Sequence, residues 1–119
     1  MKFKILFLVI LLNNVIYSQE KEYLLSTVAF YNVENLFDTI DDPNNSWDEA
    51  RTPNGEDKWT DKKYNIKLNN LSELIPKIGF DVTNSHPAIV GLCEVENKQV
   101  LIDLISTGKM KDLNYGIIH

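Results

Sequence analysis

Two stretches of the chain are apolar at nearly every position rather than at alternate positions. Residues 24–33 are rich in β-branched and aromatic side chains, and residues 88–93 form a shorter run of the same kind. Continuous apolar runs of this length are typical of strands that are covered on both faces. The pattern therefore predicts two buried strands, and residues 113–119 begin a third segment with strand character.

Apolar residues at helical spacing predict a first helix over residues 60–78. Thr60 can cap its start, and Pro76 and Gly79 are expected to end it. The predicted buried stripe consists of Leu68, Leu71, Ile75 and Ile78.

A second helix is predicted over residues 98–107, with Asn97 as its cap and Gly108 as its stop signal. Its apolar face consists of Val100, Leu101, Leu104 and Ile105. The resulting order of strand, loop, helix, strand, helix and strand indicates an α/β fold.

The connection over residues 39–59 is a long loop rich in Asp, Asn, Pro and Gly. Its acidic residues and the preceding Asp38 lack the spacing of a calcium-binding loop, so we expect solvated loop charges. Loops of this length are usually functional or disordered. Trp47 and Trp59 are candidates to pin the loop down, and Trp47 could instead meet a ligand.

The first 18 residues have the pattern of a secretory signal peptide. Lys2 and Lys4 precede an unbroken apolar run over residues 5–12, and the predicted mature chain starts near Gln19. The run is shorter than the ~20 residues of a spanning helix, although an uncleaved anchor is the alternative. We therefore expect a secreted or periplasmic protein with no stable membrane span after cleavage.

Composition narrows the function classes. The 119 residues carry a formal charge of −5, and removal of residues 1–18, which hold two lysines and no acid, makes the balance more negative. This argues against a broad basic surface for non-specific nucleic-acid binding. The only cysteine, Cys93, excludes an internal disulfide and a cysteine-based zinc site, and we expect it to be a small buried apolar residue.

Polar side chains follow both predicted strands where they end. Asn32 and Glu34 lie at the end of the first strand, and Glu94 follows the second. In a continuing strand Asn32 and Glu34 would share one face, and the two strand ends could meet at one edge of a sheet. Oxygen ligands without cysteine or histidine favour Mg²⁺ or Mn²⁺ over zinc. Alternatively, Glu94 and Glu96 are simply the first solvated residues after a strand.

These motifs resemble a known family. Residues 28–38, Val-Ala-Phe-Tyr-Asn-Val-Glu-Asn-Leu-Phe-Asp, resemble the first motif of the endonuclease/exonuclease/phosphatase family. Residues 89–94 resemble its second motif, in which a strand ends in a metal-binding glutamate. The Trp59-Thr60, Tyr64 and Lys67 positions are similar to the secreted or periplasmic bacterial branch, and the resemblance covers residues 25–119.

The resemblance implies a DNase I-like α/β sandwich of two sheets and a magnesium-dependent phosphoesterase activity. Glu94 would be the principal metal ligand, and Asn32 would also lie at the metal, where it orients the phosphate and the attacking water. Glu34 stands where some members carry a second acidic residue near the metal. The implied substrates are phosphate esters, among them nucleic acids and nucleotides.

The chain departs from the family pattern at two points. Cys93 stands where the family often has glutamine, and the later Asp-x-Asn and Asp-His motifs do not occur before His119. We therefore expect residues 19–119 to be the N-terminal part of a truncated domain, inactive alone and without a cooperative unfolding transition. The alternatives are a non-catalytic secreted binding module that retains the fold, and an α/β fragment with no role of its own.

Overall fold

The computed structural model describes residues 22–119, so the predicted signal peptide over residues 1–18 lies outside the described part. The helices and strands are β1 (Val28–Leu36), α2 (Asp61–Leu74), α3 (Phe80–Thr83), β2 (Ile89–Val95) and α4 (Lys98–Ile105). Short 3₁₀ turns occupy Glu49–Arg51, Ile75–Lys77 and Gly108–Asp112. The mixed helix and strand content confirms the α/β class.

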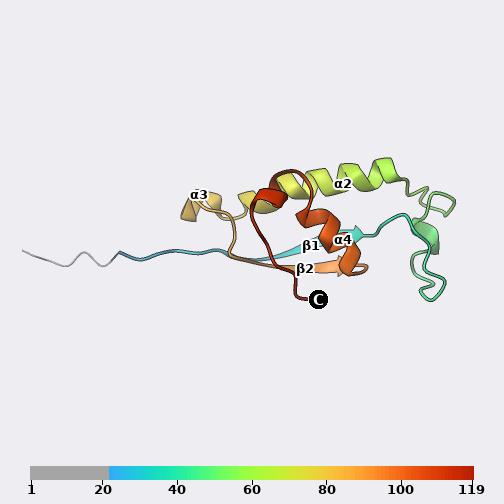
Figure 1. Ribbon diagram of the computed structural model, residues 1–119, viewed down its shortest axis with the longest axis horizontal. Coiled ribbons are helices and arrows are strands. Elements are labelled where there is room, and N and C mark those ends of the chain that lie inside the picture. The colour runs from blue at the N-terminus through green and yellow to red at the C-terminus, as the bar shows by residue number, and fades with distance from the viewer. Residues whose placement is uncertain (1–21) are drawn as a thin grey trace, which may run out of the picture.

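β1 and β2 form a parallel pair, the only sheet within residues 22–119. Their register joins Val28 to Ile89 and Asn32 to Cys93, and then shifts so that Leu36 faces Val95. Because the strands are parallel, their carboxyl ends lie at the same edge (Figure 1). This arrangement brings the polar residues that follow both strands close together.

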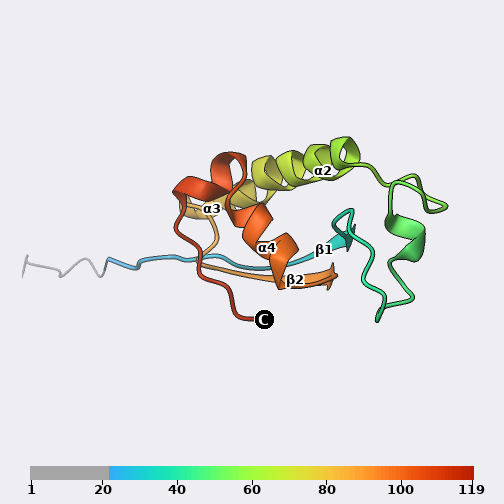
Figure 2. The same ribbon diagram turned by 45° about the vertical axis from the view of Figure 1, so that its right-hand side comes forward.

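All the helices pack on one side of the strand pair, as both ribbon views show (Figures 1 and 2). α2 contributes an inward stripe at helical spacing, and α4 and the 3₁₀ turn Gly108–Asp112 pack beside it. The buried core consists of Val33, Leu36, Tyr64, Leu68, Leu71, Ile75, Val100, Leu104 and Met110. Tyr64 extends the predicted stripe of α2 at its N-terminal end, whereas Ile78 is only half-buried.

The opposite face of the strand pair is open in the described part of the chain. Phe30 is 86% exposed, and Val28 and Ile89 are also exposed. The prediction that these strands are covered on both faces is wrong for residues 22–119, because every helix packs on the same side. Cys93 lies beside Asn32 in the register and is exposed, so its predicted burial is wrong as well.

The predicted helix caps are confirmed. The Thr60 side chain accepts a hydrogen bond from the Lys63 N–H, and Asn97 Oδ1 accepts one from the Val100 N–H at 3.1 Å. Gly79 adopts a left-handed φ of 70°, and the short helix α3 follows it where the sequence predicted only a polar connection. The starts of both long helices are therefore set by local side chains.

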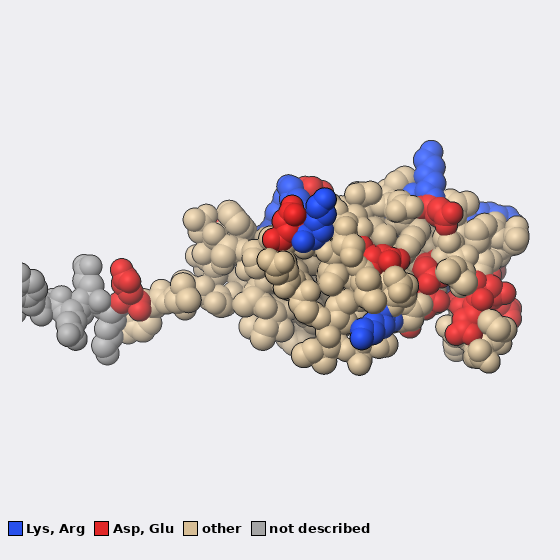
Figure 3. All heavy atoms as spheres, viewed as in Figure 1, with Lys and Arg blue, Asp and Glu red and all other residues tan. Residues whose placement is uncertain are grey.

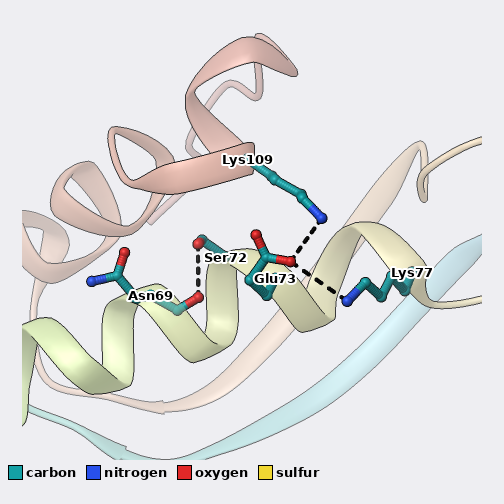
Figure 4. A network of polar contacts seen from close by, with 5 residues as sticks. All are labelled: Asn69, Ser72, Glu73, Lys77 and Lys109. Carbon is teal, nitrogen blue, oxygen red and sulfur yellow. Dashed lines mark hydrogen bonds and ion pairs between the residues drawn. The ribbon is translucent and has the colours of Figure 1, made fainter.

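The 3₁₀ turn Gly108–Asp112 is tied to α2 by an exposed ion-pair network (Figure 4). Lys109 Nζ lies 2.7 Å from Glu73 Oε2, and Lys77 Nζ lies 3.5 Å from the same oxygen. Gly108 packs against Ser72 with a φ of 49°, and a Cβ there would meet Ser72 Oγ at 2.3 Å. This contact requires glycine between α4 and the turn.

The strand predicted over residues 113–119 is not formed. These residues have no regular structure, and the Tyr115 hydroxyl donates a hydrogen bond to the Pro87 carbonyl at 2.5 Å. Apolar alternation indicates which side chains can be buried, but a strand also needs a backbone partner alongside it. Within residues 22–119, no helix is both long and apolar enough to cross a membrane.

Candidate functional site

β1 and β2 both depart from regular strand geometry near their carboxyl ends, at neighbouring positions of the sheet. Between Asn32 and Leu36 the register shifts, and Glu34 and Asn35 have φ values of 54° and 63°. On β2, Glu94 has a φ of 62°. Non-glycine residues with positive φ are uncommon and often occur at functional sites. We call this region, with Asn32, Glu34 and Glu94, the strand-end site.

Asn32 and Glu94 are brought into direct contact in the strand-end site. The Asn32 Nδ2 group donates a hydrogen bond to Glu94 Oε1 at 2.7 Å. The Asn32 Oδ1 atom accepts one from the Glu34 backbone N–H, also at 2.7 Å. The Asn32 amide is therefore held from both ends, with its nitrogen toward the carboxylate of the neighbouring strand.

Glu34 contributes its backbone to this network. The prediction that Asn32 and Glu34 share a strand face assumed regular alternation, which the positive φ of Glu34 breaks. Its carbonyl and that of Asn35 instead accept hydrogen bonds from Lys67 Nζ, the latter at 3.2 Å. The Glu34 carboxylate is close enough to the Lys67 ammonium to interact with it electrostatically.

Lys67 is a neighbour of the site to which the sequence assigned no role. It comes from α2, 33 residues along the chain from Glu34, and its ammonium lies 5.7 Å from the centre of the Trp59 ring. Burial lowers the pKa of Lys67, while the carboxylates of Glu34 and Glu94 oppose that shift. Its spacing from Tyr64 and Leu71 places it at the edge of the buried stripe, which is the signal that could have identified it.

A second group of carboxylates lies beside the site. Glu96 Oε2 accepts a hydrogen bond from the Asp38 N–H at 2.9 Å, and the Asp48 side chain is also near Glu96. Burial raises the pKa of Glu96; the bond from the Asp38 N–H opposes this, and the neighbouring carboxylates add to it. Figure 3 shows acidic side chains gathered at the end of the molecule that carries the long loop.

The expectation that all the loop acids are solvated is wrong for Asp48. Asp48 is 2% exposed, and its Oδ2 accepts a hydrogen bond from the Asp42 N–H at 2.9 Å, whereas its Oδ1 has no partner within residues 22–119. The Asp48 side chain therefore links two parts of the loop, residues 42 and 48. Trp59 donates from Nε1 to the Phe37 carbonyl at 2.9 Å and anchors the loop, while Trp47 is exposed.

The oxygen atoms of the strand-end site are ligands of the kind that a hard cation prefers. Glu94 uses Oε1 to accept from Asn32, so Oε2 remains able to ligate, and the carboxylates of Glu34 and Glu94 both act on the Lys67 ammonium. Mg²⁺ commonly takes one or two protein carboxylates and completes its shell with water and substrate phosphate. Residues 22–119 hold no cluster of three or more His, Cys, Asp or Glu side chains that could bind a metal ion.

Comparison with known proteins identifies one relationship. The sequence profile described as the endonuclease/exonuclease/phosphatase family matches residues 27–119. Comparison with curated proteins and with solved structures returns no significant match. The match confirms the resemblance inferred from residues 28–38 and 89–94.

Proposed function

The chain belongs to the endonuclease/exonuclease/phosphatase family, and on that premise we propose that it is a metal-dependent phosphoesterase that hydrolyses phosphodiester or phosphomonoester bonds. The family is generally made up of hydrolytic nucleases and phosphatases with a phosphoesterase-type fold. Its enzymes act on phosphate esters such as nucleic acids and typically use a divalent metal. For this chain we propose Mg²⁺, with Mn²⁺ as a substitute.

One observation supports this proposal more than any other. The hydrogen bond between Asn32 and Glu94, 2.7 Å long, joins the two motif residues across the carboxyl ends of parallel strands. Ligands of open α/β sheets bind outside the carboxyl ends of the strands, where loops leave room for them. The two residues are 62 positions apart in the sequence, so their contact depends on the fold.

The residues of the strand-end site would divide the work as follows. Glu94 would hold the cation through its carboxylate, with Asn32 beside it and Glu34 as a further candidate ligand. A bound Mg²⁺ supplies Lewis-acid polarisation of a phosphate oxygen. Asn32 would use its remaining amide N–H to orient the phosphate and the attacking water, because one N–H of its Nδ2 group is already committed to Glu94.

The substrate we propose is a phosphate ester, with nucleic acids and nucleotides among the candidates. The chain has a net charge of −5, which argues against a broad basic surface for a long polyanion. A cation held by carboxylates can supply the missing positive charge locally. This reasoning favours a contact limited to the reacting phosphate and its neighbours.

Glu94→Gln tests the proposed function. Hydrolysis of bis(p-nitrophenyl) phosphate and of p-nitrophenyl phosphate is measured on the protein isolated at its native length while Mg²⁺ or Mn²⁺ is titrated. We expect metal-dependent hydrolysis by the wild-type protein and a loss of at least about a hundredfold in Glu94→Gln, because the principal ligand is gone.

Glu73→Gln is the matched control, since Glu73 is an exposed carboxylate on α2 that lies in the ion-pair network with Lys109. It should retain wild-type hydrolysis. Metal-dependent hydrolysis that survives in Glu94→Gln would overturn the proposal, as would wild-type protein that hydrolyses neither ester at any metal concentration. The second result would favour the binding-module alternative.

We also propose that the protein is exported to the periplasm or the exterior. The support is the charged and apolar pattern of residues 1–18, which lie outside the described structure. Amino-terminal sequencing of the native protein should find a start near Gln19, and retention of Met1 would contradict export with cleavage.

A further inference from the structure

The strand-end site depends on a backbone conformation that its own residues do not favour. Glu34 and Asn35 are consecutive non-glycine residues with φ values of 54° and 63°. A left-handed conformation costs free energy for side chains other than glycine and persists only where the surroundings hold it. Contacts from outside the strand must therefore stabilise this bulge.

Lys67 provides that contact. Its ammonium donates hydrogen bonds to the carbonyl oxygens of both left-handed residues, Glu34 and Asn35. A cation is the suitable partner here because two carbonyl dipoles face the same point, and hydrogen bonds from a charged donor are stronger than neutral ones. The same nitrogen bridges both residues, so it constrains their relative orientation.

The Lys67 side chain is itself held in place. It is half-buried, and its ammonium lies 5.7 Å from the centre of the Trp59 ring, within the range of a cation–π contact. Trp59 is fixed in turn by the hydrogen bond from Nε1 to the Phe37 carbonyl at 2.9 Å. The ammonium is therefore pre-positioned by α2 and by the segment that leads into it.

A continuous series of contacts joins Lys67 to the carboxylate of the neighbouring strand. Lys67 holds the carbonyl of Glu34, and the N–H of Glu34 donates to Asn32 Oδ1 at 2.7 Å. The amide nitrogen of Asn32 then donates to Glu94 Oε1 at 2.7 Å. A change in the bulge would move the Glu34 N–H and release the Asn32 amide.

We propose that Lys67 is a positioning residue, which holds the left-handed bulge of β1 so that the Asn32 amide stays oriented against the Glu94 carboxylate. This inference rests on the proposed function, since it assigns Lys67 a part in the same site. It acts through the backbone of Glu34 and Asn35 and needs no contact with substrate. Substitution of residues that orient metal ligands without touching the metal typically lowers metal affinity by about 10–100-fold.

The test compares Lys67→Met, Lys67→Arg and a matched control. Lys63→Met is that control, because Lys63 also lies on α2 and donates from Nζ to a backbone carbonyl, that of Asp57. The first readout is the pair of side-chain amide signals of Asn32 in ¹H–¹⁵N NMR spectra without metal. The second is Mn²⁺ binding, measured by isothermal titration calorimetry.

We expect Lys67→Met to shift the Asn32 amide signals as far as Glu94→Gln does and to weaken Mn²⁺ binding by at least about tenfold. Lys67→Arg should retain most of the wild-type signal position, because its guanidinium still offers donors to both carbonyls. Lys63→Met should match the wild-type protein in both readouts. The side-chain amide of Gln99, which donates to Asp103 Oδ1 at 2.9 Å, reports whether each variant is folded.

Three results would overturn the proposal. The first is an unchanged Asn32 signal in Lys67→Met, and the second is an equal shift in Lys63→Met. The third is loss of the Gln99 signal in Lys67→Met, which would assign Lys67 to folding rather than to positioning. Failure of the proposed function gives a different result: Glu94→Gln would then bind Mn²⁺ as tightly as the wild-type protein does. The Asn32 signals recorded without metal would still test the role of Lys67.

Discussion

The helical layer of α2 and α4 and the strand-end site lie against each other but are stabilised in different ways. In the helical layer, apolar side chains at regular spacing are buried, and Leu68, Val100 and Leu104 have 3% exposure or less. In the strand-end site, the stabilising contacts are hydrogen bonds around three residues with positive φ. The comparison separates residues that hold the fold from residues that shape the chemistry.

The difference also concerns what each region tolerates. An apolar core accepts a change of side chain at a cost set by the volume lost. The conformation of a bulge that is held by a few hydrogen bonds depends on each donor and acceptor, because each hydrogen bond positions the group that makes the next one. Substitutions in the two regions should therefore separate folding stability from metal affinity.

The largest effect on stability should follow Leu104→Ala in the helical layer. Leu104 is 1% exposed, and truncation of a buried leucine costs about 2–5 kcal/mol of unfolding free energy. Denaturant unfolding of the protein isolated at its native length measures the loss. Ile66→Ala on α2 is the control, since Ile66 is 50% exposed and should change stability by less than about 0.5 kcal/mol. Equal losses in the two variants would remove the distinction between the buried layer and its surface.

A smaller effect should follow Asn35→Val in the strand-end site. A β-branched residue is strongly disfavoured at the φ of 63° found there, and the strain should cost about 1–3 kcal/mol. Asn35→Gly is the matched control, because glycine adopts this conformation without strain and should leave stability unchanged or slightly higher. Both are measured by thermal unfolding. A valine variant as stable as the glycine variant would show that the bulge is not strained.

The smallest effect should come from the exposed network that ties the 3₁₀ turn Gly108–Asp112 to α2. The hydrogen bond from Lys109 lowers the pKa of Glu73 below its ordinary value of 4.5, with Lys77 adding to the shift. A lowered carboxyl pKa stabilises the fold above the ordinary pKa and loses that contribution as the pH falls through the lowered value. The stability difference between the wild-type protein and Lys109→Met should therefore be present at pH 7 and decline as the pH falls below 4.5.

Lys111→Met is the control for this pH dependence, because Lys111 lies in the same turn and forms no ion pair within the described residues. Its difference from the wild-type protein should not vary with pH in the same way. The Lys109 effect should also shrink in high salt, since the pair is exposed and therefore screened. A difference for Lys109→Met that does not decline below pH 4.5 would show that the lysine contributes by packing.

Much of the helical layer could be predicted from the sequence. The caps Thr60 and Asn97 were correct, and most of the predicted apolar positions are buried or half-buried. The first helix ends earlier than predicted, at Leu74, and Ile78 is only half-buried. These features depend on residues within about four positions of one another, which the sequence displays directly. The start of β1 was less accurate, because Leu24 and Leu25 precede the strand and are exposed.

The site could be predicted only as a set of candidates. Asn32, Glu34 and Glu94 were named because polar residues followed strand patterns, and the fold brings Asn32 and Glu94 into contact. Their roles as ligands and in catalysis stay predictions. The helical spacing of Lys67 could have placed it at the edge of the buried stripe, but not against the bulge, because Glu34 is 33 residues away along the chain. The burial of Asp48 has no local signature, because it depends on how the loop folds.

The sequence by itself determined the family, the α/β class and the residues available for chemistry, since motifs, periodicity and caps are local. Only the tertiary structure decided the register that places Asn32 beside Cys93, the bulge at Glu34 and Asn35, and the open face of the strand pair. The physical reason is that strand pairing and helix docking select one arrangement from many that the same local pattern allows. The position of each polar atom in the strand-end site follows from that selection.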